Sequence, residues 1–330
     1  MAERSPDAKR SGSVFSRGRM MVGLILLAAI AAAVAYAFGA NRGGPDPGRL
    51  VYAGEEGVFV RELETGKVRR VGPLPDDTTF GIASPDGRWY SYVERNGALW
   101  MLSLEENRRF ELSGAGALPL GWSPDGKLVA RELLDDRDIV LIDPEGGSRV
   151  LWSRGAIDVR FPVWLDAERF VILDDQAQEE LALVKLAGPR STITHIGNGN
   201  PVAASPDGKE ILVQRGESLV VAKLDGGRLT NERKLFDGSI GHSSVSHQGY
   251  VAFTAKDEEG RIGVWVLRGG NESERVLSES VTWMDWSRDG STILYAVEGS
   301  VYALTLPDGK PKKVSGDVTV FDLNGFAVVP

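Results

Sequence analysis

Ser84-Pro85-Asp86-Gly87 is the stretch that decides the fold, because the same phrase returns along the chain about every forty residues. Proline presets the backbone angle of a turn, aspartate bonds to nearby backbone amides, and glycine adopts the left-handed conformation that closes the turn. The other copies are Ser123-Pro124-Asp125-Gly126, Ser205-Pro206-Asp207-Gly208 and Ser287-Arg288-Asp289-Gly290. A strand-like apolar run follows each copy, so each phrase predicts a β-hairpin.

The aspartates of these turns are interpreted as structural, although regularly spaced carboxylates resemble ligand sets. The turns lie on separate repeats and point outward, so their carboxylates are not expected to converge on one ion. Each aspartate is expected to bond to its own turn. The structural turn positions are Asp86, Gly87, Asp125, Gly126, Asp207, Gly208, Asp289 and Gly290.

Weaker copies of the phrase, at 164–170, 246–250 and 322–326, extend the series to seven. A second series of seven turns follows aliphatic strands and contains glycine or asparagine at the turn. Its members are Thr65-Gly66, Glu106-Asn107, Gly146-Gly147, Ala187-Gly188, Gly226-Gly227, Gly269-Gly270 and Asp308-Gly309. Two hairpins per repeat make four strands, which is one blade of a β-propeller. The sequence therefore predicts an all-β propeller of seven four-stranded blades, with six and eight blades as alternatives.

The two series of turns are offset at the ends of the chain. The chain begins with a hairpin of the second series, at about 50–72, and ends with one of the first series, at about 316–330. The two terminal segments are therefore expected to complete one blade together, which removes exposed sheet edges. One strand is left over in this scheme, because 50–52 and 326–329 both fit the same position in the blade.

The repeated order of residues resembles that of the TolB-like, WD-repeat-related β-propellers. It consists of an aromatic residue, Ser-Pro-Asp-Gly, a basic residue and an aliphatic strand, then a second aliphatic strand and a glycine turn. The resemblance covers about residues 50–330, and four of the seven turn motifs are close to intact. That family includes periplasmic scaffolds that bind protein partners, and similar propellers are attached to serine peptidases. The resemblance implies the fold and leaves the function open.

The N-terminal region has the pattern of a membrane anchor. Residues 20–38 are 19 uncharged, mostly aliphatic residues, nearly enough in a helix to cross the ~30 Å core of a bilayer. Five basic residues in 1–19 predict that this tail stays in the cytoplasm and that the C-terminal part is extracytoplasmic. Residues 39–48 are rich in glycine and proline and indicate a linker to a propeller over 49–330. The alternative is a signal peptide cleaved after 35–37.

Composition narrows the classes of partner. Residues 20–330 carry 33 basic and 44 acidic residues, a net charge of −11, so nucleic acid is not an expected partner. The chain has no cysteine, which fits an exported domain without disulfides and argues against a lipid anchor on an N-terminal cysteine. Membrane attachment is therefore expected through the helix itself.

The residue types of common active sites are present but not in productive patterns. No Gly-x-Ser-x-Gly pentapeptide occurs, so the nucleophile elbow of a serine hydrolase is missing. His242 and His247 bracket one predicted strand and lie roughly 16 Å apart, and His195 falls in the outer strand of another blade. No cofactor is predicted; an all-oxygen calcium site is the alternative. The tryptophans at 122, 164 and 286 precede turns and are interpreted as packing between blades.

One group of loops is the candidate ligand surface. The connections between the second and third strands of successive blades should emerge on one rim, where a rigid scaffold presents recognition residues. This rim is acid-rich, so it is expected to bind a cationic segment or a divalent ion. Its candidate residues are Glu94, Arg95, Asp135, Asp136, Asp138, Asp174, Asp175, Asp257 and Glu258.

These patterns predict a non-enzymatic binding or scaffolding module on the outer side of the bacterial cytoplasmic membrane. Its partner would be a protein, a peptide or an envelope component bound across one propeller face. The alternative is a lactonase-like or glycan-cleaving enzyme that uses the central channel, with or without a divalent metal.

Overall fold

The structure is a computed structural model, and it describes most of the chain from residue 46 onward. The described residues are 46–106, 108–113, 116–132, 138–152, 162–174, 180–187, 190–205, 207–246, 248–268, 272–316, 318–319 and 326–330. They belong to one compact unit, Asp46–Pro330. The predicted tail, the helix over 20–38 and most of the linker lie outside them. Within the described ranges, no helical segment combines the length and the apolar character of a membrane span.

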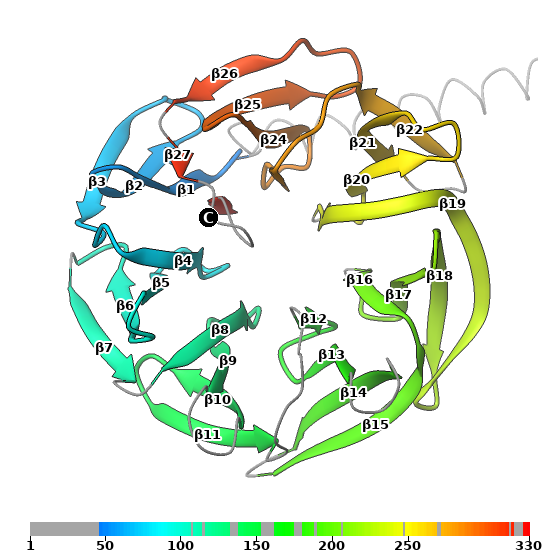
Figure 1. Ribbon diagram of the computed structural model, residues 1–330, viewed down its shortest axis with the longest axis horizontal. Coiled ribbons are helices and arrows are strands. Elements are labelled where there is room, and N and C mark those ends of the chain that lie inside the picture. The colour runs from blue at the N-terminus through cyan, green and yellow to red at the C-terminus, as the bar shows by residue number, and fades with distance from the viewer. Residues whose placement is uncertain are drawn as a thin grey trace, which may run out of the picture. The chain divides into compact units, whose positions relative to one another are not determined.

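The described strands are antiparallel and form six hydrogen-bonded sheets arranged around a ring (Figure 1). The sheet that contains both ends of the described unit consists of β1 (Arg49–Gly54), β2 (Gly57–Glu62), β3 (Val68–Gly72), β27 (Val318–Thr319) and β28 (Phe326–Val329). The next two sheets are β4 (Thr78–Ala83), β5 (Trp89–Glu94), β6 (Leu99–Ser103) and β7 (Arg109–Ser113), then β8 (Ala117–Trp122), β9 (Leu128–Glu132), β10 (Ile139–Asp143) and β11 (Gly147–Trp152). This radial arrangement is that of a β-propeller.

The remaining sheets continue the ring. One is β12 (Val163–Trp164), β13 (Arg169–Asp174), β14 (Glu180–Ala187) and β15 (Arg190–Asn198). A seven-stranded sheet follows, with β16 (Asn200–Ala204), β17 (Glu210–Arg215), β18 (Ser218–Asp225), β19 (Arg228–Val245), β20 (Val251–Asp257), β21 (Ile262–Leu267) and β22 (Ser273–Leu277). The last is β23 (Trp283–Trp286), β24 (Thr292–Val297), β25 (Ser300–Thr305) and β26 (Lys312–Ser315). Strands β4, β8, β12 and β16 lie next to the central channel in their groups (Figure 1).

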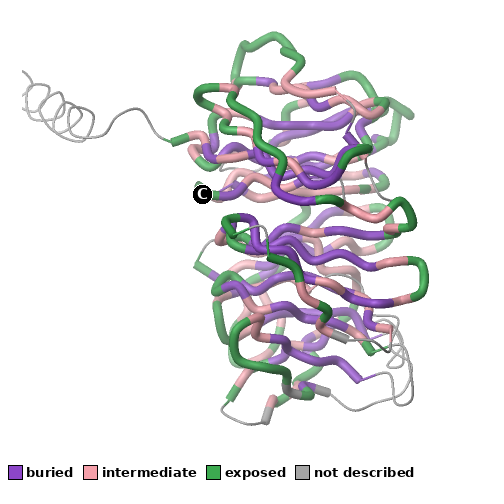
Figure 2. Tube along the Cα trace, turned by 90° about the vertical axis from the view of Figure 1, so that its left-hand side faces the viewer, coloured by how far each residue is buried: buried purple, intermediate pink, exposed green. Residues whose placement is uncertain are grey.

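The core lies between neighbouring sheets. The middle strands are covered on both faces, so they are nearly continuous apolar runs, such as 139–142 in β10 and 170–173 in β13. Outer strands are half exposed, and β3 carries two consecutive arginines. Figure 2 shows the buried positions running along the strands, with the exposed ones gathered at the turns. Phe170 and Phe253 are fully buried.

The repeated Ser-Pro-Asp-Gly turns use their side chains internally. Ser84 Oγ donates to Asp86 Oδ1 at 2.5 Å and accepts the Trp89 N–H at 2.9 Å. The same serine-to-aspartate bond recurs from Ser123 to Asp125, from Ser205 to Asp207 and from Ser287 to Asp289. The closing glycines have φ of +71° at Gly87, +80° at Gly126, +64° at Gly208 and +65° at Gly290, the left-handed region that favours glycine.

Close packing of successive turns is a second reason for glycine. A Cβ at Gly208 would lie 2.5 Å from the carbonyl oxygen of Leu165, which belongs to the turn of the preceding sheet. A Cβ at Gly290 would meet the Gln248 side chain of its preceding turn in the same way. The turns therefore pack against one another around the ring, so their sequence repeats for contact between blades as well as for backbone conformation.

The two ends of the described unit meet in one sheet, as the offset of the two series of turns predicts. β1 pairs with β2 along one edge and with both β27 and β28 along the other. The predicted hairpin at 316–330 is wrong, because Thr319 pairs with Ala53 and Val329 pairs with Arg49, each from the same side of β1. Residues 326–329 are thus innermost and 50–52 are second, which places the strand that the prediction left over.

The long strand β19 joins two groups of four strands. Its first part pairs with β18 as an outer strand, and its second part, from Gly238, pairs with β20 as an inner strand. Gly238 has φ +143°, and a register shift between Ile240 and Ser243 marks the inner part. Residues 73–77 and 278–282 separate these two roles between β3 and β4 and between β22 and β23, and Gly199 alone separates them between β15 and β16. In β19 the backbone passes from the outer edge of the ring to the channel within a single strand.

Candidate functional site

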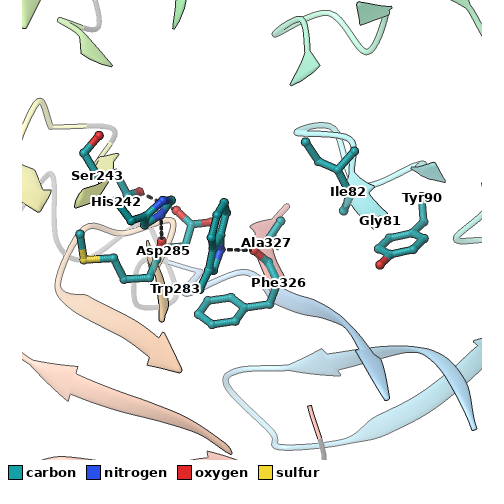
Figure 3. A pocket seen from close by; sticks show the side chains of 12 residues that line it. Gly81, Ile82, Tyr90, His242, Ser243, Trp283, Asp285, Phe326 and Ala327 are labelled. Carbon is teal, nitrogen blue, oxygen red and sulfur yellow. Dashed lines mark hydrogen bonds between the residues drawn. The ribbon is translucent and has the colours of Figure 1, made fainter. Parts of the chain in front are cut away.

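A cavity of about 210 Å³ lies among inner strands of the ring (Figure 3). Its walls come from β4, β19, β23 and β28, together with one residue of β5. The polar side chains are those of Tyr90, His242, Ser243, Ser244 and Asp285. The apolar wall is formed by Ile82, Ala83, Trp283, Met284, Phe326 and Ala327.

His242 is held as a neutral imidazole. Its Nε2–H donates to the Met284 carbonyl oxygen at 2.8 Å, and its ring lies 3.8 Å from the Trp283 ring, centroid to centroid. Because a carbonyl only accepts, Nε2 carries the proton and Nδ1 keeps its lone pair. Burial lowers the pKa of His242 to about 4, although the bond to the carbonyl acts in the opposite direction. The imidazole therefore links two inner strands without a charge.

Folding stability should fall between pH 6.5 and pH 4 because of His242. The folded imidazole has a pKa of about 4 and the unfolded one about 6.5, so in this window the unfolded chain binds a proton that the folded chain does not. The contribution is complete above pH 6.5 and falls by about 3 kcal/mol as pH approaches 4. Urea unfolding of the wild type and of His242→Gln at pH 7, 5 and 4 measures it. Parallel stability curves for the two proteins would contradict the assignment.

Asp285 is a carboxylate that is held by three donors within the ring. Oδ1 accepts from Ser244 Oγ and from the Trp286 N–H, each at 2.8 Å, and Oδ2 accepts from the Val328 N–H at 2.9 Å. Burial raises the pKa of Asp285 above its usual value, and the three hydrogen bonds act against that rise. The carboxylate thus joins β19, β23 and β28 across two gaps between sheets.

Tyr90 reaches the cavity from the second strand of its sheet. Its ring passes beside Gly81 of β4, where a Cβ would collide with the phenol oxygen. The side chain is 3% exposed, and burial raises the pKa of its hydroxyl. Figure 3 shows Tyr90 across the cavity from His242, Trp283 and Asp285. Among the described residues this hydroxyl has no hydrogen-bond partner, unlike the other polar groups of the wall.

Tryptophans bind neighbouring sheets together. Trp122 Nε1 donates to the Ile82 carbonyl at 3.2 Å, and Trp286 Nε1 donates to the Ser244 carbonyl at 3.1 Å, each on the inner strand of the preceding sheet. Trp283 Nε1 donates at 2.8 Å to the Phe326 carbonyl of the following sheet. Trp164 is half-buried, and its Nε1 has no partner in the described part of the chain. The interblade interpretation therefore fits Trp122 and Trp286 best.

The rim loops lie at the opposite ends of the inner strands from the Ser-Pro-Asp-Gly turns. The carbonyls of Gly97, Glu217 and Gly299 in these loops accept from backbone amides at the start of the next inner segment. Asp135, Asp136 and Asp175 lie outside the described residues. The described candidates are Glu94, Arg95, Asp138, Asp174, Asp257 and Glu258.

The described rim candidates differ in burial and in their bonding partners. Asp174 is 1% exposed and lies 3.1 Å from His195 Nε2, and Asp257 is bonded to Arg261 at 2.6 Å. Burial opposes ionisation of Asp257, but the bonds from Arg261 lower its pKa overall. Asp138 is also buried. Arg95 and Glu258 are exposed and Glu94 is half-buried, so these three present charge to solvent.

Among the described residues, no group of three or more His, Asp or Glu side chains could hold a metal ion. His195 lies between two carboxyl groups, with Asp174 at 3.1 Å from Nε2 and Glu180 at 3.7 Å from Nδ1. The aspartates of the repeated turns stay in their own turns: Asp86 bonds to Arg88 and Asp125 to Lys127.

Sequence reasoning missed the channel cavity, although one signal was available. Two residues before the turn, the successive inner strands carry Ile82, Gly121, Val163, Ala203, Ser244 and Asp285. Asp285 is thus a lone carboxylate at a position that is otherwise small or apolar. Tyr90 and His242 have no comparable signal, because the same strand positions carry varied residues in other repeats.

No protein-family model matches this chain, and a search of curated sequences returns no significant match. Solved structures do match. The β-propeller domain of Cps50 (Swd1) from Myceliophteria thermophila is 14% identical with a TM-score of 0.56, covering 74% of this chain and 88% of that one. An oligogalacturonate lyase in complex with manganese is 14% identical with a TM-score of 0.59, covering 86% and 87%. The oligogalacturonate lyase of Vibrio parahaemolyticus is 12% identical with a TM-score of 0.57, covering 80% and 93%.

These similarities confirm the β-propeller fold. They include both the propeller domain of Cps50 (Swd1) and lyases, and identities of 12–14% carry the fold alone.

Proposed function

We propose that residues 49–330 form a seven-bladed, TolB-like propeller that acts as a non-enzymatic binding module. In this proposal the seven-stranded sheet counts as two blades. The helix over 20–38 holds the propeller on the outer side of the bacterial cytoplasmic membrane, and a protein, peptide or envelope component binds across the rim. No resident cofactor is proposed.

One observation carries this proposal: most polar groups of the channel cavity are already used to join blades. His242 donates to one backbone carbonyl, Ser243 donates to that of Val202 at 3.1 Å, and Asp285 accepts three bonds. These bonds fix the orientation of each side chain, although Nδ1 of His242 and one acceptor position on Asp285 Oδ2 stay free. Side chains fixed in interblade bonds favour a rigid scaffold, and function then falls to its loops.

Charge reversal on the rim tests this function. Glu94→Lys with Glu258→Lys changes two solvent-facing charges, and Glu64→Lys with Asp308→Lys is the matched control on the opposite face, where both positions are exposed. The full chain is crosslinked in membranes of the source organism. We expect an adduct whose yield falls at least several-fold in the rim variant and is kept in the control. Equal adducts in all proteins, or equal loss in both variants, would overturn the proposal.

The second candidate is an enzyme that uses the channel, which the similarity to two lyase propellers favours. Its test is incubation of the full chain with oligogalacturonate, with and without manganese or calcium. The binding proposal expects no unsaturated uronide product under either condition. Formation of that product, and its loss in Tyr90→Phe, would replace the binding module with a lyase.

A further inference from the structure

The channel cavity contains one acidic side chain without a basic partner. Among the described residues that line it, Asp285 is the one acidic side chain, none is arginine or lysine, and His242 is neutral at pH 7. Burial without a nearby cation raises the pKa of Asp285. The described chain places no arginine or lysine in an ion pair with this carboxylate. Its three donors are an alcohol and two backbone amides, which carry no formal charge. A buried carboxylate without a cation favours a ligand that brings one.

The acceptor position that remains free on the Asp285 carboxylate suits an ammonium group better than a guanidinium group. Oδ1 already accepts two hydrogen bonds and Oδ2 accepts one, so Oδ2 keeps one free acceptor position. A guanidinium binds a carboxylate best through two parallel bonds, which need a free position on each oxygen. An ammonium group needs one position here and takes its other acceptors from neighbouring groups. The Tyr90 hydroxyl, which has no hydrogen-bond partner among the described residues, lines the same cavity from its opposite side.

The volume and the apolar wall of the channel cavity indicate the part of the ligand that carries the ammonium group. At about 210 Å³ the cavity is smaller than the roughly 300–1,000 Å³ of sites for drug-sized molecules. Ile82, Phe326 and Ala327 give it an apolar side that suits a short alkyl chain.

We propose that this cavity binds a primary alkylammonium group, with Asp285 as its counter-charge and the Tyr90 hydroxyl as a second acceptor. The ammonium group belongs either to a free alkylamine or to a lysine side chain of a partner. The site lies in the channel and does not depend on the rim, so failure of the rim experiment leaves it untouched, and the reverse also holds.

Titration of the full chain with n-butylammonium tests the site, with n-butanol as the neutral probe of similar shape and N-butylguanidinium as the forked cation. We expect saturable binding of butylammonium in the millimolar range, roughly tenfold tighter than either comparison probe. Equal affinity for butanol would overturn the proposal, as would the lack of saturable butylammonium binding in that range.

Two substitutions locate the binding. Asp285→Asn should weaken butylammonium binding by roughly tenfold or more, because a charged hydrogen bond is lost. Tyr90→Phe should weaken it by about threefold. Asp308→Asn, an exposed carboxylate away from the channel, is the control and should bind as the wild type does. A folded Asp285→Asn protein with unchanged affinity would overturn the proposal. If that variant does not fold, unchanged affinity in Tyr90→Phe overturns it instead.

A last comparison separates the two sources of the ammonium group. A lysine-containing peptide that binds more tightly than butylammonium, and loses this binding in Asp285→Asn, supports a partner's lysine. Tighter binding of the free amine than of the peptide supports a small-molecule amine at the same carboxylate.

Discussion

A chain that ends at residue 325, and so lacks β28, is expected to lose about 3–6 kcal/mol of unfolding free energy. Phe326 and Val329 are 6% and 1% exposed, so their loss removes two buried apolar side chains from the sheet. The edge of β1 at Leu50 and Tyr52 is then unpaired. Because a domain of this kind is stable by about 5–15 kcal/mol, the loss should be visible as a large fall in the urea midpoint.

The matched control for this truncation is a chain that lacks Pro330 alone. Pro330 is exposed and lies outside the strand pairing, and its carbonyl accepts one exposed hydrogen bond from the Arg49 side chain, so its removal should leave the midpoint near that of the wild type. A truncation at 325 that unfolds at the wild-type urea concentration would show that β28 does not close the ring.

Trp286→Ala is expected to destabilise the protein by about 3–5 kcal/mol. The indole is 4% exposed, packs between the inner strands of two sheets and donates to the Ser244 carbonyl. Trp286→Phe keeps much of the volume and should cost less, near 1 kcal/mol for the hydrogen bond. Chemical unfolding of both variants separates packing from hydrogen bonding.

Trp164→Ala provides the internal comparison for this tryptophan. Trp164 has the equivalent position before its turn, but it is half-buried and its indole N–H has no partner in the described residues. Its loss should therefore cost clearly less than the loss of Trp286. An equal loss of unfolding free energy in the two alanine variants would mean that burial and the indole hydrogen bond do not determine the contribution of these tryptophans.

The repeat made much of the fold predictable, because turn chemistry is local. Ser84 and Asp86 bond to each other and to the backbone amides of Arg88 and Trp89, so a short stretch of sequence is enough to predict the turn. The packing of Gly290 against Gln248 was not predictable, because it joins residues 42 positions apart on different sheets. The terminal strand was misplaced for a related reason: Phe326–Val329 has the pattern of either an inner or a second strand, and only its partner decides between them.

The candidate site was much less predictable than the fold. Rim residues were selected by charge, yet Asp174 and Asp257 are buried in bonds to His195 and Arg261. The channel cavity brings together side chains from strands at 81–83, 242–244, 283–285 and 326–327, and no local pattern links them. Asp285 alone stands out, through its difference from the equivalent positions in other repeats.

The uninterrupted strand β19 has a consequence for local opening. Amide protons exchange with solvent when a cooperative unit opens, and such units are usually bounded by loops. β19 hydrogen-bonds to β18 with one half and to β20 with the other, without an irregular connection between them. The seven strands from β16 to β22 are therefore expected to gain and lose protection from exchange together, as the largest cooperative unit among the described sheets.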